Sequence, residues 1–228
     1  MKKQNTSQWL TPLLALACAA LMAGCASSNS GYQQADKTGE SINTLRTDVL
    51  NIKIAVDASM KAMDDLAASA SKDPRKAYEA FAKSVTQVED AGNTAKKNAE
   101  TMQAKGAEYF KQWETQIATV QNEKIRDLAQ KRKAKLQEAF GNIKKSAQDA
   151  KESFPIYLAD LKDLRTALST DLTVQGISAL KGVFKKTKKE GVEVKENLDD
   201  LEAELNTVVA AITAAKEAAA PAEGAPKK

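Results

Sequence analysis

The sequence predicts an all-α protein, an elongated antiparallel helical bundle or coiled coil of about four long amphipathic helices. Apolar residues recur at alternating steps of three and four along most of the chain, which is the spacing of a buried helix stripe. Charged residues make up 28% of the composition and aromatic residues only 5%, as is typical of long helices. No segment has the alternation of a strand, and the connections are short, so successive helices should be antiparallel.

The first two helices are expected on either side of Pro74. The first seam consists of Ile42, Leu45, Val49, Ile52, Val56, Ser59, Met63, Leu66 and Ala70. Asp73 is a good N-cap, with Pro74 at the first position of the second helix. The second seam runs from Tyr78 to Val120, but its middle is filled by small residues, namely Gly92, Ala95, Ala99 and Gly106. These would let a neighbouring backbone come close.

Residues 121–123 leave two interpretations open. The seam is sparse there, with Ile125 and Leu128 as its next members, and a basic stretch at residues 131–133 follows. A reversal at this point, which we favour, gives two helices. Without a reversal, one helix would run from Pro74 to Ser153 and measure about 120 Å at 1.5 Å per residue.

The last two helices are separated by Thr173, a plausible N-cap. The third seam consists of Leu136, Phe140, Ile143, Ala147, Ala150, Phe154, Leu158, Leu161, Arg165, Leu168 and Leu172. The spacing of its apolar residues continues on both sides of Pro155, so we expect a kinked but continuous helix, although proline in a helix interior costs about 3 kcal/mol. The fourth seam consists of Ile177, Leu180, Phe184, Thr187, Gly191, Val194, Leu198, Leu201, Leu205, Val208, Ile212 and Ala215. We expect Leu201 to be buried and Glu190 to be exposed.

A turn at residues 172–173 would bring opposite charges of the last two helices together. The expected pairs are Lys144 with Asp200, Lys145 with Asp199, Lys185 with Asp160 and Lys181 with Asp163. Exposed pairs contribute only about 0.2–1 kcal/mol each, so these charges would select the register of the hairpin more than stabilise it.

The first 25 residues have the order of an export signal. Two lysines precede an apolar stretch from about Trp9 to Leu21, and small residues precede Cys25. The apolar stretch is shorter than the roughly 20 residues of a spanning helix. The box from Met22 to Cys25 resembles the lipobox of bacterial lipoproteins, in which the cysteine is lipidated and becomes the first residue, although leucine is usual where Met22 stands. The alternative is an ordinary secretory peptide with a chance cysteine.

These features predict four regions. Residues 1–24 are a signal peptide that is removed, 25–37 a lipidated flexible tether, 38–219 the helical bundle and 220–228 a disordered tail. The mature chain would keep Cys25 alone, so no disulfide forms within it. Ala26 rather than aspartate follows the cysteine. By resemblance to the sorting rule of Gram-negative lipoproteins, this favours the periplasmic face of the outer membrane in a Gram-negative cell.

The composition argues against most enzymatic chemistry. The chain has no histidine, the predicted mature chain has no free thiol, and no glycine-rich phosphate loop occurs. We therefore expect no catalytic, metal or cofactor site, and the acids between Glu196 and Glu204 should be solvated flanks of a heptad helix. Without residues 1–24 the chain has 32 basic and 30 acidic residues. This near-neutral balance argues against nucleic-acid binding, which needs a basic face.

The densest basic run is the candidate interaction surface. It consists of Lys181, Lys185, Lys186, Lys188 and Lys189. These lysines either contact an anionic lipid or polymer or, as we favour, pair with acids of the same molecule. Tyr109, Phe110 and Trp113 either line a ligand crevice or, more simply, belong to the core. Lys228, the last residue, offers covalent attachment to peptidoglycan as a further alternative.

Three stretches carry a family resemblance. They are Phe-Lys-Gln-Trp-Glu at residues 110–114, the basic stretch near Arg132 followed by Leu136, and Phe154–Pro155 leading through Leu161 to residues 172–180. They span about residues 105–185 and resemble an uncharacterised family of bacterial helical proteins, a domain of unknown function whose members are often predicted to be lipoproteins. The resemblance implies no particular catalytic or binding residues.

The sequence therefore predicts a non-enzymatic lipoprotein, held to the membrane by its N-terminal lipid. It would have a structural or adaptor role, binding another envelope protein or a second copy of itself through its coiled coil. The alternative is a bundle that binds a lipid or other apolar ligand between its helices. A pocket lined by residues 95–113 would favour ligand binding, and a filled seam with an exposed apolar stripe would favour the adaptor.

Overall fold

The computed structural model of the chain describes residues 31–217, which form five helices. They are α1 (Gly31–Ser69), α2 (Arg75–Ala118), α3 (Glu123–Thr170), α4 (Val174–Ala179) and α5 (Lys181–Glu217). No strand occurs between residues 31 and 217, which confirms the predicted all-α class. The predicted signal peptide, Cys25, the first part of the predicted tether and the C-terminal tail lie outside the described residues.

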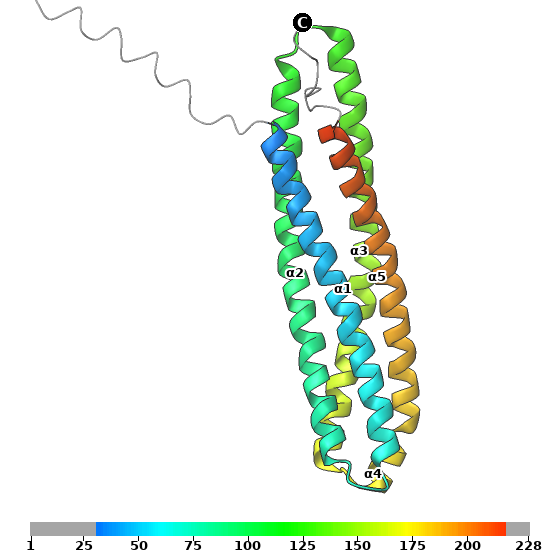
Figure 1. Cartoon of the computed structure of the whole chain (residues 1–228). Helices are drawn as coiled ribbons and strands as arrows, with labels where there is room; N and C mark the ends of the chain where they lie inside the picture. Colours follow the sequence, from blue (N-terminus) through cyan, green and yellow to red (C-terminus); the bar gives the residue numbers. More distant parts are fainter. Residues whose placement is uncertain (1–30, 218–228) are drawn as a thin grey trace, which may run out of the picture. The chain divides into compact units, whose positions relative to one another are not determined.

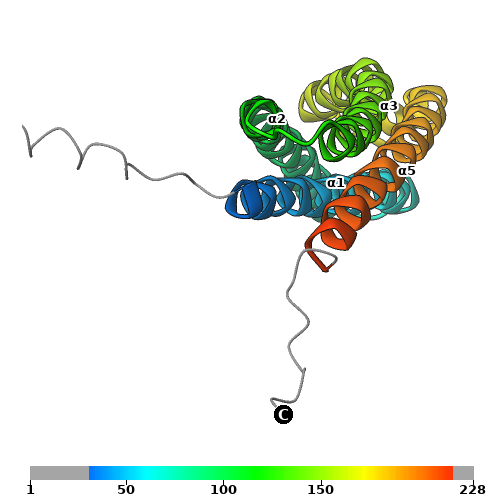
Figure 2. The same ribbon diagram turned by 90° about the horizontal axis from the view of Figure 1, so that it is seen from above.

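The four long helices form an antiparallel bundle in which each helix packs against two neighbours. α1 and α3 lie at opposite corners, and both contact α2 and α5 (Figures 1 and 2). The turn between α1 and α2 lies at the same end as the short helix α4, and we call this the closed end (Figure 1). At the other end, α2 and α3 extend past the first turns of α1. We call residues 99–143 of these two helices the hairpin end.

The bundle begins earlier than the sequence predicts. α1 starts at Gly31, so the second part of the expected tether, residues 31–37, is helical. Gln34 and Thr38 are buried at the two seam positions before Ile42, and the Thr38 hydroxyl donates a hydrogen bond to the Gln34 carbonyl at 2.8 Å. Because these seam residues are polar, apolar spacing could not reveal them.

The predicted seams are buried along most of their length. Every predicted position of α1 from Ile42 to Leu66 is buried, and Leu201 of α5 is only 6% exposed. The third seam needs a correction after Pro155. The helix continues through the proline as expected, but Tyr157 and Leu164 are the buried residues there. The next step after Phe154 is three residues rather than the predicted four, so Leu158 and Arg165 fall beside the seam and are half-buried.

Side-chain caps mark where the helices begin after each turn. α2 ends at Ala118 and α3 begins at Glu123, which confirms the reversal at residues 121–123. The Asn122 side chain caps α3 by accepting from the Ile125 N–H at 3.1 Å, and Thr173 caps α4 by accepting from the Gly176 N–H at 3.1 Å. α2 begins at Arg75, one residue later than expected, and the Asp73 carboxylate accepts from the Arg75 N–H at 3.2 Å.

The seam glycines of α2 accommodate aromatic rings of α3 rather than a backbone. A Cβ at Gly92 would lie 2.5 Å from the ring of Phe154, and one at Gly106 would lie 2.7 Å from the ring of Phe140. Such contacts are too close for real carbon atoms. The expectation that a neighbouring backbone comes close is therefore wrong at these positions, where two phenyl rings fill the space.

Charges connect α1 to α5 more than α3 to α5. Asp57 pairs with Lys195 at 2.6 Å, Asp64 with Lys188 at 2.7 Å, and Lys53 with both Asp199 and Glu202. Each step forward along α1 is matched by the same step back along α5, as antiparallel neighbours require. The expected pairing of Lys145 with Asp199 is therefore wrong, because Asp199 bonds to α1.

One predicted pair between α3 and α5 is shifted by a single residue. Asp160 bonds to Lys186 at 2.7 Å, not to Lys185. Lys186 also pairs with Glu190 at 2.6 Å, and the Glu190 side chain is only 17% exposed. The expectation that Glu190 is an exposed residue is thus wrong, because Lys186 draws it toward α3.

Candidate functional site

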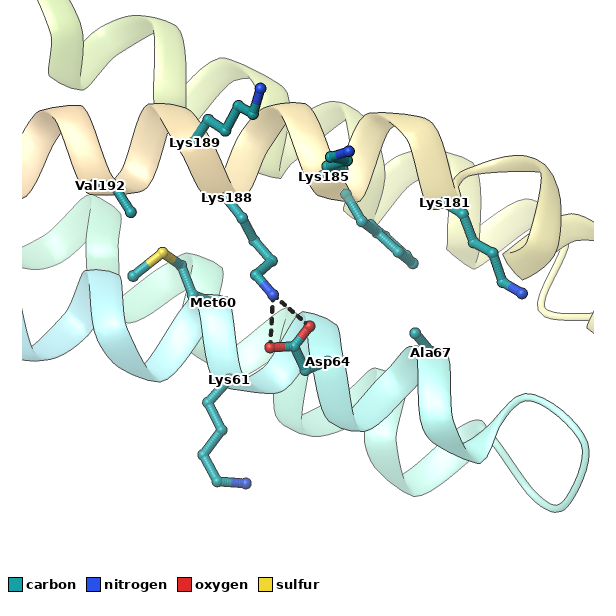
Figure 3. A pocket seen from close by; sticks show the side chains of 10 residues that line it. Met60, Lys61, Asp64, Ala67, Lys181, Lys185, Lys188, Lys189 and Val192 are labelled. Atoms are coloured by element: carbon teal, nitrogen blue, oxygen red, sulfur yellow. Dashed lines mark hydrogen bonds and ion pairs between the residues drawn. The ribbon is translucent and has the colours of Figure 1, made fainter.

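A basic groove lies between the last turns of α1 and the first turns of α5. It has a volume of about 740 Å³ and is lined by Met60, Lys61, Asp64, Ala67, Lys181, Phe184, Lys185, Lys188, Lys189 and Val192 (Figure 3). Five of these residues are lysines and only one is acidic, so the groove carries a net positive charge. α1 contributes one wall and α5 the other.

The structure divides the predicted lysine run between two sides of α5. Lys181, Lys185, Lys188 and Lys189 line the groove, whereas Lys186 binds Asp160 and Glu190 on the side of α3. Hydrogen bonds to Asp160 and then to Glu190 raise the pKa of Lys186, and the bond from Lys186 lowers the pKa of Asp160. The intramolecular interpretation is therefore right for Lys186 and for Lys188, which pairs with Asp64, and it does not account for the other three lysines of the run.

Three groove lysines are left available to a ligand. Lys188 crosses the groove and donates to both carboxylate oxygens of Asp64, at 2.7 and 2.8 Å (Figure 3). Lys181, Lys185 and Lys189 are exposed and form no ion pair with any described residue. Cations without partners on one surface attract an anionic ligand and increase its rate of association.

Apolar side chains form the floor of the groove. The ring of Phe184 is almost fully buried, Met60 is half-buried, and Val192 is 49% exposed. Gly191 lets the Met60 side chain pack directly against the backbone of α5, because a Cβ there would lie 2.9 Å from the Met60 sulfur. The groove thus offers charge at its rim and apolar contact beneath, a combination that suits an acidic segment with some apolar side chains. Between residues 31 and 217, no His, Cys, Asp or Glu residues cluster as metal ligands would.

Sequence reasoning found the α5 side of this groove and missed the α1 side. Met60, Asp64 and Ala67 each follow a predicted seam residue of α1 by one position. Their position flanking the seam was visible, but no pattern in the sequence indicated that the first and last long helices are neighbours. The sequence predicted only contacts between consecutive helices.

A second, smaller crevice opens between α2 and α3 at the hairpin end. It has a volume of about 320 Å³ and is lined by Leu45, Ala99, Met102, Gln103, Gly106, Ala107, Phe110, Phe140, Gly141, Ile143, Lys144, Ala147 and Lys151. Of the three predicted aromatic residues, only Phe110 lines it, edge to face with Phe140 at 5.2 Å between ring centres. Tyr109 is buried, which raises its pKa, and Trp113 packs against it at 5.4 Å.

None of the helices between residues 31 and 217 is long and apolar enough to cross a bilayer.

Comparison with known proteins gives a family but no characterised relative. No curated protein and no solved structure matches the chain. A family model described as a protein of unknown function (DUF2959) matches residues 27–216, a longer stretch than the part that carries the sequence resemblance. The chain therefore belongs to the DUF2959 family, whose function is unknown.

Proposed function

We propose that this protein is an envelope lipoprotein anchored at Cys25, and that its bundle is an adaptor whose basic groove binds an acidic partner. The lipid anchor is supported by the order of the first 25 residues, which is basic, then apolar, then small residues before Cys25. The family region begins at residue 27, just after that cysteine. The periplasmic face of the outer membrane is the expected location if the cell is Gram-negative.

The position of the groove is the observation that carries the adaptor role. α1 starts at Gly31 at one end of the bundle and reaches Asp64 in the groove near the other end. Thirty-three residues of helix separate them, which corresponds to about 50 Å at 1.5 Å per residue. A protein anchored upstream of Gly31 would hold this groove well away from its attachment point, where it can reach a second envelope component.

The anchor is tested by replacing the predicted lipidation site. Cys25→Ser should leave unprocessed precursor and abolish labelling by a fatty-acid analogue, because the thiol is the acceptor of the lipid. Normal trimming and labelling of this variant would refute the anchor.

The groove is tested by crosslinking in cells, with a photoreactive residue in place of Val192. A discrete adduct with an acidic partner is expected. It should be lost when Lys181, Lys185 and Lys189 are all changed to glutamate. Changing Lys83, Lys96 and Lys97, which are exposed on α2, to glutamate is the matched control and should leave the adduct intact. Equal loss in both triple variants would mean that only overall charge matters and would refute a specific groove.

The crevice between α2 and α3 supports a second candidate function, the binding of an apolar ligand. Its lining is mostly apolar, and its volume lies at the lower end of the range for small-ligand sites. Ala99, Met102, Gly106 and Phe110 belong to the 95–113 stretch expected to line such a pocket. Lys144 and Lys151 also line the crevice and would suit an anionic head group.

Filling the crevice tests this second candidate. Ala147→Leu should abolish the displacement of a fluorescent fatty acid from the purified protein, whereas Ala134→Leu on an exposed position of the same helix should not. If neither variant changes binding, or if the wild-type protein binds no fatty acid, the crevice is not a ligand site.

A further inference from the structure

The first three turns of α3 leave two large apolar residues in solvent. Ile125 is 55% exposed and Leu128 is 61% exposed, although they are only three residues apart on one helix. Both were expected to continue the seam between the helices, and both point away from it instead. Residues that a bundle does not bury and that lie side by side indicate a surface for contact with something else.

The charges on the same side of the helix as these two residues all have one sign. At 3.6 residues per turn, an arc of about 120° on this helix carries Lys124, Ile125, Leu128, Lys131, Arg132 and Lys135. We call these six residues the basic face. Its six members are all exposed, and the acids Glu123 and Asp127 fall outside the arc. Apolar residues surrounded by lysine and arginine are the pattern of helices that lie in the interface of an anionic membrane.

A comparison within the molecule shows that exposure alone does not produce this pattern. Ile54 of α1 is 66% exposed, and Leu50 lies one turn before it. The same arc of α1 includes Asp57, which pairs with Lys195 of α5. The α1 face is therefore of mixed charge and engaged within the bundle. The cations of the basic face form no ion pair with any described residue, and its Arg132 lies 5.8 Å from the centre of the Trp113 ring of α2.

The basic face lies at the end of the bundle where the chain enters α1. The Thr38 hydroxyl contacts the Lys105 carbonyl at 3.4 Å, which sets α1 and α2 side by side at that level. From there α2 continues to Ala118, about 20 Å further, while α1 extends only to Gly31, about 10 Å. The rise per residue thus places the turn between α2 and α3 about 10 Å beyond Gly31. Figure 1 shows this turn past the start of α1.

We propose that the basic face of α3 rests on an anionic lipid bilayer, the one that holds the lipid of Cys25. This inference rests on the proposed lipid anchor. Five residues lie between Cys25 and Gly31, and an extended chain spans at most about 20 Å over the six steps from one to the other. A bundle tethered so closely brings its hairpin end to the membrane surface, where Leu128 and Ile125 enter the interface and the four cations contact lipid phosphates. Each such cation strengthens binding about fivefold.

The test uses the mature lipidated protein in vesicles of equal parts phosphatidylcholine and phosphatidylglycerol. A nitroxide is attached at Leu128→Cys, and its collisions with oxygen, which concentrates in lipid, are compared with collisions with a water-soluble nickel chelate. We expect oxygen to dominate at position 128 and the nickel chelate to dominate at Ile54→Cys, the matched exposed control on α1. Changing Lys124, Lys131, Arg132 and Lys135 to glutamate should return the label at 128 to water.

The outcomes separate this inference from the anchor on which it rests. If the protein does not float with the vesicles, the lipid anchor is absent and the proposed function fails. If it floats and the label at 128 remains in water, the anchor stands and the membrane contact is refuted. A label shielded from both collision partners would mean that a protein surface covers the basic face. Equal burial in pure phosphatidylcholine would show that the cations do not select anionic lipid.

Discussion

The closed end and the hairpin end bury the same kind of seam to different depths. At the closed end Leu66, Phe81, Leu161, Leu168 and Ile177 are fully buried. At the hairpin end Ile143 keeps 2% and Leu136 8% of its surface, and Ile125 and Leu128 are exposed. Four helices surround the first group, whereas α2 and α3 are nearly alone at their tip. A heptad pattern thus states which face is apolar, and the number of neighbouring helices decides how well that face is covered.

The largest expected effect tests this difference directly. Leu161→Ala should cost about 3–5 kcal/mol of unfolding free energy, because the cavity is enclosed on all sides. Leu136→Ala should cost about 2 kcal/mol or less, since water and the mobile ends of neighbouring side chains can fill the space. Urea unfolding followed by circular dichroism measures both. Equal costs would show that the two ends are equally well packed.

Alkaline pH should reveal the polar group inside the closed end. The Tyr157 hydroxyl is 2.6 Å from the Ser59 hydroxyl, and burial raises the pKa of Tyr157 to about 12. A raised pKa in the folded state favours the neutral phenol, so its contribution is complete below the unfolded value near 10 and is lost as pH rises toward 12. The wild-type protein should lose about 2–3 kcal/mol over that window.

Tyr157→Phe is the control for this titration, because it keeps the ring and removes the ionisable hydroxyl. Lysines titrate in both proteins, so the difference between their stability curves isolates Tyr157. Parallel curves between pH 10 and 12 would mean that the phenol is not buried as described.

Glycine substitutions should separate filled from open positions between α2 and α3. Gly92→Ala places a carbon against the Phe154 ring and should destabilise the fold by about 1–2 kcal/mol, even though alanine favours helix. Gly141 has open space around it, so Gly141→Ala should stabilise by up to about 1 kcal/mol. Thermal unfolding measures whether each substitution lowers or raises the stability of the fold. Gly92→Ala combined with Phe154→Leu should recover much of the loss, and failure to do so would contradict the ring-in-glycine contact.

The smallest effects are expected from single ion pairs at the surface. Asp57→Asn should cost about 0.2–1 kcal/mol, as exposed pairs do. Glu114→Gln should lie at the upper limit of that range, because its partner Lys133, at 3.2 Å, has a side chain only 10% exposed. Denaturant unfolding at low and high salt distinguishes them. A larger loss at Asp57 would reverse the expected order.

The sequence predicted the helices well because heptad spacing is a local property of the chain. It located the reversal near residue 122, the cap at Thr173 and the continuation of α3 through Pro155, where the carbonyl deprived of its partner belongs to the exposed Lys151. It failed where the answer depended on a neighbour. The choice between Tyr157 and Leu158 as the buried residue is decided by what faces α3, and spacing alone permits either.

The candidate groove shows the same limit for function. The lysines of α5 were evident as a run, yet Lys186 belongs to a different surface from Lys185 and Lys188. Residues next to each other on a helix point about 100° apart, so a run of charges is divided among several surfaces. Met60 of the apolar floor and Asp64 come from a helix more than a hundred residues earlier, which only the folded chain brings to α5.

The antiparallel contact of α1 with α5 also determines how the protein would carry tension. A pull on Gly31, resisted by a partner held in the groove, acts along the axis of α1. The pairs of Lys53, Asp57 and Asp64 with α5 and the seam from Ile42 to Leu66 would then be loaded in shear, all at once. Pulling α1 sideways would instead break the same contacts one after another at low force. The placement of the chain entry and the groove at opposite ends of one helix thus makes the bundle a mechanically strong link in that direction.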